Sequence, residues 1–407
     1  MHIKLAKIFF VLLLFYNSWY QNVIAVIPRM MLMLGVPMML MLLFHCIKYK
    51  LNIFNILSKE FSLWLLFTIS SFVFGVFVAE DVPLVLSSVF TLFQHVILLS
   101  AVLIIASEDK SVSFFVIVYL CLALFCAATA IFTGDDYYRG RVSIGDLNPN
   151  TLGLLMCNGI FCSLFLLNLK KNTNILLSFS AIIVFLYVII LTGSRKSLIS
   201  ALLLIIAWLV FIFWSNVSYI SIRKKFGVLT TLLLICTFSY ILVSPLITNS
   251  VMFTRIDLLF EQGDPVREGL IQQGMQLFAE NPILGIGYDQ YSFIYNTYSH
   301  STYVEILACT GIVGALTYFP VYLIIIYKLT KILIANTDPE TKLTTKLMLA
   351  LMAIFIFLAV GIIHFYRLDS MVMFGVLIAF CNMSLKKNKD QEKNEQASCS
   401  TIRQKTT

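Results

Sequence analysis

The sequence predicts an all-α integral membrane protein with about twelve transmembrane helices, and three observations support this fold class. Hydrophobic residues make up 59% of the 407 residues and charged residues only 12%, against about 25% charged residues in an ordinary soluble domain. Apolar runs long enough to cross a bilayer follow one another along the chain. Basic residues gather in alternate loops. So little charge excludes a soluble enzyme, and 34 Phe, 18 Tyr and 4 Trp exclude a disordered chain.

The apolar runs give the transmembrane elements in order. Helices are expected because a lipid-facing backbone must satisfy its own hydrogen bonds, and the alternating ten-residue segments of a β-barrel are absent from the sequence. The first run is interrupted by Tyr16-Asn17-Ser18, and the last run is short. The twelve expected spans are 7–26, 29–47, 61–79, 84–106, 112–132, 150–169, 175–192, 197–214, 226–247, 302–326, 347–366 and 370–385.

The distribution of charge orients these spans. With both termini in the cytoplasm, 21 of the 29 basic residues lie inside and 8 lie outside, as the positive-inside rule requires. This topology explains the net charge of +8 better than binding to nucleic acid does. We expect residues 1–385 to form a single membrane domain and 386–407 to form a polar, disordered cytoplasmic tail. No cleaved N-terminal signal is apparent.

Residues 248–301 form an outer loop far longer than a connector needs, and such loops usually carry function or are disordered. Asp264, followed by proline, predicts the N-cap of an amphipathic helix that ends at Asn281. Arg267 lies in its first turn, where free N–H groups and a guanidinium together favour an anion. Pairing of Arg267 with Asp264 or Glu268 on a wet surface is an equally good interpretation.

His300 lies directly before the span 302–326. Glu305 follows about one turn later, so the two side chains are able to share one helix face. A histidine that titrates near neutral pH suits general-base work on a hydroxyl. Considered alone, an interfacial histidine is more often structural. Gly311 and Gly314, three positions apart in this span, would let another helix approach closely.

A tight outer turn, 192–197, contains the adjacent cations Arg195 and Lys196. The positive-inside rule predicts few cations on the outer side, so this adjacent pair is an exception. A phosphate ligand would explain it. Anchoring to lipid headgroups is the alternative. The other outer cations, each a weak signal individually, are Arg139, Arg141 and Arg255.

No metal site is expected. The nine cysteines contain no CxxC pair, and most lie inside apolar runs, where they serve as small buried residues. On the outer side Asp135-Asp136 is the nearest approach to a cluster of metal ligands, and two adjacent carboxylates alone are a weak signal.

Together the outer segments resemble the O-antigen ligase and O-antigen polymerase superfamily of membrane glycosyltransferases. The signature of that family is His, then Asn or Ser, a nine-residue spacer and Gly-x-x-Gly. His300 and Ser301, with Gly311 and Gly314 at the required distance, match this signature. The sequence departs from the family by having Ser301 where Asn is usual and by lacking the Arg-x10-Gly pattern of some polymerases.

Other stretches are similar to the same family. NPILGIGY at 281–288 is similar to its "NPLFGIG" stretch, TGSR at 192–195 to its "TGSR" turn, and NPN at 148–150 to the start of a middle span. Arg267 looks like the arginine that opens the family's helix before the first of these stretches. The residues to which the resemblance gives a structural role are Gly285, Gly287, Asn150, Gly311 and Gly314.

The resemblance implies a GT-C-like fold and a glycan transfer that needs no nucleotide sugar, cofactor or metal. The donor would be a polyprenyl-pyrophosphate-linked oligosaccharide, and the acceptor a sugar hydroxyl on a glycan or glycolipid. Arg195 and Arg267 would clamp the pyrophosphate, and His300 would act as base or orient the acceptor hydroxyl. The residues expected to help bind the substrates are Lys196, Arg255, Arg139, Arg141 and Glu305.

The resemblance also implies a setting, the outer face of a bacterial inner membrane, with a chain-length regulator and a flippase as candidate partners. It leaves open a polymerase of polysaccharide repeat units and a ligase that transfers the glycan to lipid A-core or another acceptor. We take the polymerase as the first hypothesis and the ligase as the alternative.

A transporter or flippase is the main rival from another class. Transporters place ionisable residues near mid-membrane and often show internal repeats. Here the span interiors are nearly free of charge, and no repeat is visible. His95 is the main exception, which we interpret as a hydrogen-bonded or cavity-lining residue. A scaffold for other membrane enzymes would not gather arginine and histidine on one side. A long outer loop with its own helix also suits a surface enzyme better than a transporter, so an enzyme is favoured.

Overall fold

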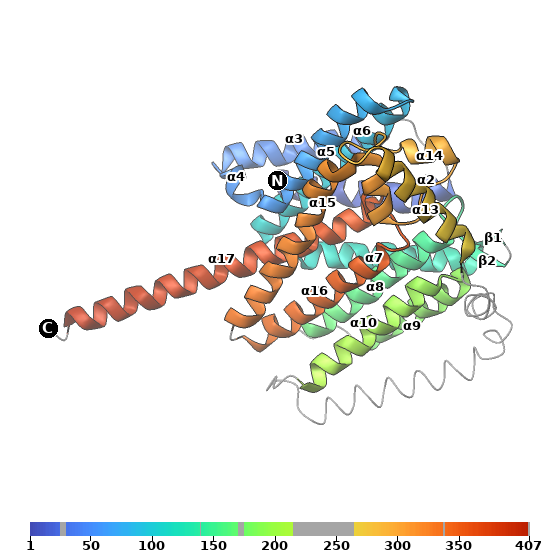
Figure 1. The fold of residues 1–407 in the computed structure, drawn as a ribbon. Helices are drawn as coiled ribbons and strands as arrows, with labels where there is room; N and C mark the ends of the chain where they lie inside the picture. Colours follow the sequence, from blue (N-terminus) through green and yellow to red (C-terminus); the bar gives the residue numbers. More distant parts are fainter. Residues whose placement is uncertain (25–29, 139, 170–174, 215–263, 337, 406–407) are drawn as a thin grey trace.

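The computed structural model describes the chain except residues 25–29, 139, 170–174, 215–263, 337 and 406–407 (Figure 1). In chain order its elements are α1 (His2–Phe15), η1 (Tyr16–Tyr20), α2 (Gln21–Val23), α3 (Met30–Lys48), α4 (Ile53–Ile56), α5 (Lys59–Val78), α6 (Val82–Asp109), α7 (Ser113–Thr133), β1 (Asp135–Tyr138), β2 (Arg141–Ser143), α8 (Pro149–Asn168), α9 (Ile175–Thr192), α10 (Arg195–Trp214), α13 (Pro265–Glu280), α14 (Gln290–Tyr295), α15 (Thr302–Ala335), α16 (Pro339–Leu358), η2 (His364–Tyr366) and α17 (Leu368–Lys405).

Eleven helical segments among the described residues are long and apolar enough to cross a membrane. They match eleven of the twelve expected spans, and the expected span 226–247 lies outside the described residues. The interrupted first span is continuous because the π-helix η1 bridges α1 and α2. The prediction of an all-helical, multi-pass membrane protein is confirmed, and the described sheet structure consists of the small β1–β2 hairpin.

The helices pack into one bundle around a continuous apolar core. α15 lies against α5 and α16, α10 lies against α16 and α8, and α17 lies against α6 and α15. Large aromatic side chains fill the interior, among them the fully buried Trp64, Trp208 and Tyr119. The two short helices α13 and α14 lie against α15 at one end of the bundle (Figure 1). We call this end the site end.

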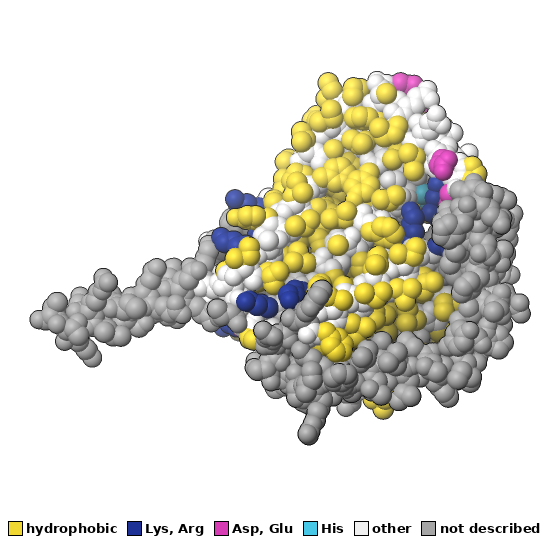
Figure 2. Space-filling model, turned by 60° about the horizontal axis from the view of Figure 1, so that its bottom comes forward, with side chains coloured by type: hydrophobic (Ala, Val, Ile, Leu, Met, Phe, Trp, Pro, Cys, Tyr) yellow, Lys and Arg dark blue, Asp and Glu magenta, His cyan; other side chains and the backbone are white. Residues whose placement is uncertain are grey.

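Charged side chains are concentrated at the two ends of the bundle, as a membrane-spanning protein requires. At the end opposite the site end, Lys7 pairs with Asp109 at 2.6 Å, and Lys328 pairs with the buried Glu60 at 2.7 Å. Figure 2 shows a broad apolar face between basic side chains on one side and a group of basic, acidic and histidine side chains on the other. The apolar face has the character of a lipid-facing surface.

Helix starts follow the residues that the sequence places there. Asn148 caps α8 by accepting a hydrogen bond from the backbone N–H of Asn150 at 2.8 Å, and Pro149 occupies the first helical position. Ser301 caps α15, and Asp338 caps α16. These caps fix where each span begins.

The polar tail differs from the expectation of disorder. α17 continues past Leu385 to Lys405 and projects away from the bundle (Figure 1). The segment 386–405 contains no glycine or proline and is rich in Lys, Glu and Gln. These residues have high helix propensity, so a helix that begins in the membrane has no signal to end it.

Candidate functional site

The turn between α9 and α10 holds two of the expected cations. Gly193 has φ +61°, a left-handed conformation that glycine adopts at no cost. The Ser194 and Ser197 hydroxyls are 2.8 Å apart, and Gly153 of α8 leaves room for them because a Cβ there would collide with Ser197. The start of α10 is therefore held against α8. Arg195 is its first residue and Lys196 its second.

Arg141 braces this turn from the β1–β2 hairpin. Its Nε donates to the Thr192 carbonyl at 2.9 Å, and its Nη2 donates to Asn150 Oδ1 at 2.8 Å. The guanidinium therefore ties β2, the start of α8 and the end of α9 together. Arg141, expected among the substrate-binding cations, makes these contacts within the protein. Arg139 and Arg255 lie outside the described residues.

The third cation comes from α13, which covers the segment expected to be an amphipathic helix. Arg267 lies in its first turn. Asp264 occupies the N-cap position, but its side chain makes no capping hydrogen bond, contrary to our expectation. Its Oδ2 instead lies 3.2 Å from Arg195 Nη2 and 3.5 Å from Arg267 Nε. Two guanidiniums are stronger partners for a carboxylate than backbone N–H groups are.

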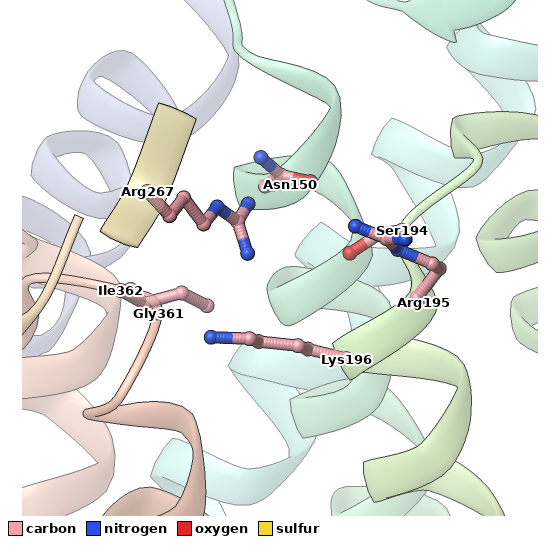
Figure 3. Close-up of a pocket in the computed structure, with 7 residues that line it drawn as sticks. All are labelled: Asn150, Ser194, Arg195, Lys196, Arg267, Gly361 and Ile362. Atoms are coloured by element: carbon pink, nitrogen blue, oxygen red, sulfur yellow. The ribbon is translucent and has the colours of Figure 1, made fainter. Parts of the chain in front are cut away.

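These elements enclose a single pocket (Figure 3). The Arg267 side chain enters from α13, and the Lys196 side chain extends from α10 toward Gly361 in the turn after α16. The ammonium of Lys196 lies so close to Gly361 that a Cβ there would collide with it. The pocket is lined by Asn150, Ser194, Arg195, Lys196, Arg267, Gly361 and Ile362. The adjacent cations Arg195 and Lys196 thus share one site with Arg267, which lies far from them in the sequence.

His300 lies beside this group of charges. It adopts a left-handed backbone conformation with φ +59°, and its ring centroid lies 4.2 Å from that of Tyr298. Burial, together with the positive charges of Arg267 and Lys196, lowers the pKa of His300 to about 4, and Asp264 opposes this shift. The imidazole is therefore neutral at physiological pH and able to accept a proton or a hydrogen bond.

Glu305 supports the loop that carries His300. The carboxylate is fully buried, and its Oε2 accepts a hydrogen bond from the Ser299 backbone N–H at 2.8 Å. Its Oε1 accepts one from the Tyr366 hydroxyl at 3.2 Å. Ser299 in turn bonds to Ser301 through its hydroxyl. Glu305, expected to help bind substrate, is occupied by these contacts and does not line the pocket.

The start of α15 is also tied to the turn that carries Gly361. The Thr302 N–H donates to the Ala359 carbonyl at 2.8 Å, and the Thr302 hydroxyl donates to the Ile362 carbonyl at 2.6 Å. The His364 N–H donates back to the same hydroxyl at 3.1 Å. Sequence reasoning missed Gly361 and Ile362 because the expected span 347–366 contained them, whereas α16 ends at Leu358 and leaves them in the turn that follows.

The expected structural glycines meet at a break in α15. Gly311 has φ +60° and ψ −160°, which interrupts the helix. Backbone groups exposed by the break pair with the loop that follows α13. Ile286 N–H donates to the Ala308 carbonyl and Gly287 N–H to the Cys309 carbonyl, both at 3.0 Å. The close approach at Gly311 is thus made by this loop rather than by another helix.

Gly285 and Gly314 also lie in crowded surroundings. A Cβ at Gly285, which has φ +69°, would collide with the α15 backbone, and one at Gly314 would collide with Thr310.

His95 is fully buried within α6 and does not line the pocket. Within the described part of the chain, no three His, Cys, Asp or Glu side chains come together as a metal site would need.

Comparison with known proteins finds a family match over part of the chain. Residues 179–319, about a third of the chain, match a family model described as O-antigen ligase. No curated protein matches the sequence. A chain of the solved structure "Structural coordination of polymerization and crosslinking by a peptidoglycan synthase complex" has a TM-score of 0.45 and 13% identity, covering 81% of this chain and 97% of that chain.

Arg195, Arg267 and His300 all fall within the matched range. The resemblance to the O-antigen ligase and O-antigen polymerase superfamily is confirmed over residues 179–319, the range that matches the family model.

Proposed function

We propose that the protein polymerises the repeat units of a surface polysaccharide at the extracytoplasmic face of the bacterial inner membrane. It transfers a glycan from a polyprenyl-pyrophosphate-linked donor to a sugar hydroxyl. The family match implies an activity of the O-antigen ligase or polymerase type. The convergence of Arg195, Lys196 and Arg267 at the site end, next to a neutral His300, carries the proposal.

The chemistry follows from these groups. The acceptor hydroxyl attacks the anomeric carbon of the donor sugar, and the bond from that carbon to the pyrophosphate oxygen breaks. Negative charge grows on the departing polyprenyl pyrophosphate, where Arg195 and Arg267 stabilise it by charge-assisted hydrogen bonds. The hydroxyl proton passes to His300, or His300 orients the hydroxyl while water accepts the proton. Side chains supply the positive charge that this proposal needs, without a metal or a cofactor.

The position of the pocket suits a lipid-linked donor. The pyrophosphate reaches the cations at the site end while the polyprenyl chain lies along the apolar face seen in Figure 2. The excess of basic residues in alternate loops supports cytoplasmic termini and an extracytoplasmic site. A flippase that delivers the donor and a chain-length regulator are the partners this reaction would need.

A ligase is the second candidate, favoured by the description of the matching family model. It shares the donor and the leaving group with a polymerase and differs in the acceptor. Transfer to lipid A-core or to another glycolipid would use the same arginines and the same histidine.

Reconstituted vesicles that contain the purified protein separate these functions. A lipid-pyrophosphate oligosaccharide supplied alone should yield a ladder of longer lipid-linked glycans if the protein is a polymerase. Product that forms only after a lipid A-core acceptor is added identifies a ligase. Uptake of the donor without formation of a new glycosidic bond would reject both enzymes in favour of a transporter.

A further inference from the structure

Asp264 places one carboxylate oxygen between the two arginines of the pocket. Its Oδ2 lies 3.2 Å from Arg195 Nη2 and 3.5 Å from Arg267 Nε. The Asp264 side chain is 30% exposed, whereas those of Arg195 and Arg267 are 14% and 22% exposed. An anion thus already lies between the two guanidiniums, on a side chain with access to solvent.

We propose that Asp264 is a built-in competitor of the donor pyrophosphate: its carboxylate pairs with Arg195 and Arg267, and a phosphate oxygen replaces it when the donor binds. This inference rests on the proposed function, because it takes the same two arginines as the pyrophosphate clamp. Asp264 would thereby set the minimum charge that an anion needs in order to enter the site.

The distances favour such an exchange. Charge-assisted N–H···O bonds are about 2.7–2.9 Å long when well formed, and both contacts of Asp264 are longer. The Asp264 contacts join one carboxylate oxygen to Arg195 Nη2 and to Arg267 Nε, whereas phosphate oxygens are able to take two parallel bonds from a guanidinium. A pyrophosphate carries more charge and more acceptor oxygens than a carboxylate. It therefore gains more from the same two side chains.

The displaced carboxylate has a second place to bind. Asp264 is the N-cap residue of α13, yet its side chain makes no capping hydrogen bond. The first N–H groups of a helix lack intrahelical partners and attract a carboxylate. A rotation of the Asp264 side chain from the arginines to the N-terminus of α13 would satisfy these groups. The cost of releasing the arginines is partly offset in this way.

The competition also gives selectivity. Arg195, Lys196 and Arg267 together form a strongly positive pocket, which without a counter-charge would attract any small anion. Asp264 reduces that attraction. Inorganic phosphate, with fewer charges and oxygens, displaces the carboxylate less readily than a pyrophosphate does. The site then discriminates in favour of the lipid-linked donor.

The test compares Asp264→Asn with Glu268→Gln, which removes the same charge from an exposed position one residue beyond Arg267 on α13. Binding of inorganic pyrophosphate and of inorganic phosphate to the full-length protein in detergent is measured by calorimetry. Transfer kinetics are measured in vesicles. Removal of the competing carboxylate should tighten pyrophosphate binding by about tenfold or more and lower the donor KM. The Glu268→Gln variant should stay within about twofold of the wild type.

Two outcomes would overturn the inference. Weaker pyrophosphate binding by Asp264→Asn would mean that the carboxylate organises the arginines for the donor. Unchanged binding would mean that it does not compete. An Arg267→Ala variant distinguishes these results from failure of the proposed function. If Arg267→Ala retains wild-type pyrophosphate binding and transfer, the arginine clamp itself is wrong, and the inference fails with it.

Discussion

At the scale of single residues, the arginines depend on the shape of the guanidinium as well as on its charge. Arg267→Lys and Arg195→Lys each keep the positive charge and lose the planar fork that binds a phosphate through two parallel bonds. We expect each substitution to lower transfer at least about tenfold. The measurement is initial rate in vesicles at equal protein, with Arg367→Lys as a control because Arg367 pairs with Asp369 and does not line the pocket. Full activity of both variants would mean that these arginines form ordinary ion pairs and do not bind the phosphate through a fork.

The charges of the pocket affect the pKa of His300, and through it the expected pH dependence of transfer. Burial, Arg267 and Lys196 lower its pKa to about 4, so the neutral form persists down to that pH. If catalysis needs neutral imidazole, kcat/KM should fall as the pH drops through about 4, rather than near the ordinary 6.5. Arg267→Ala removes a neighbouring positive charge and should move this acid limb to higher pH.

The His300→Ala variant tests the role itself. General-base catalysis contributes about 10²–10⁴-fold, so a loss in that range is expected. A variant within about twofold of wild type at all pH values would show that His300 is an interfacial anchor, since that is far below the catalytic range. An acid limb that stays in place in His300→Ala would assign the titration to another group.

At the scale of elements, Glu305 should act through the loop before α15. Glu305→Ala leaves the Ser299 N–H and the Tyr366 hydroxyl without their buried acceptor, which costs about 1–3 kcal/mol for each unsatisfied group. We expect a lower Tm and a lower kcat with little change in donor KM. Glu305→Gln keeps an acceptor oxygen and should restore most of the rate. A Gln variant as impaired as the Ala variant would instead indicate that the negative charge itself is needed.

The break in α15 gives a second test at this scale. Gly311→Ala places a Cβ at φ +60° and against the backbone of Ile283 in the loop that pairs with the break. Both the strain and the collision should lower Tm and detach the loop that holds α13 to α15. Gly269→Ala is the matched control, because nothing lies within 4 Å of a Cβ at Gly269 in α13. That change should leave Tm unchanged or raise it, since alanine favours a helix.

The elements differ in how far the sequence predicts them. Membrane spans are predictable because apolar length is a local property, and caps such as Asn148 are local as well. Asp264 is the N-cap residue of α13, as expected, but its side chain pairs with Arg195, 69 positions away, and makes no capping hydrogen bond. No local pattern encodes that pair. The polar composition of the tail beyond Leu385 predicts disorder. In the structure its high helix propensity lets α17 continue to Lys405.

At the scale of the whole molecule, the packing of the bundle determines which segments meet at the pocket, and the sequence motifs do not predict this. Each motif predicts a local feature, but only packing brings the α9–α10 turn, the first turn of α13 and the turn after α16 to one pocket. Gly361 could not be predicted because its role depends on the Lys196 side chain from another helix. Residue chemistry named Arg195, Arg267 and His300 as candidates, the family resemblance gave them roles, and the fold shows what holds each of them in place.

Orientation in the membrane is the property on which the whole site depends. The basic residues in alternate loops predict that α13 faces the outside and that the α15–α16 connection faces the cytoplasm. Single cysteines replacing Gln276 on α13 and Lys331 on α15, both exposed, test this with a membrane-impermeant thiol reagent. In intact cells the cysteine at position 276 should react and that at position 331 should react only after permeabilisation. The wild-type protein gives the background from the native cysteines.

The reverse pattern would place the cationic pocket in the cytoplasm. A flipped, lipid-linked donor would then never meet Arg195 and Arg267, because the headgroup of such a donor lies on the outer face. Reaction at both positions in intact cells would point to a leaky preparation, which a cytoplasmic marker protein detects. Labelling at position 276 alone would show that His300 lies on the same side of the membrane as the pyrophosphate and the acceptor. Glycan transfer by this site requires that condition.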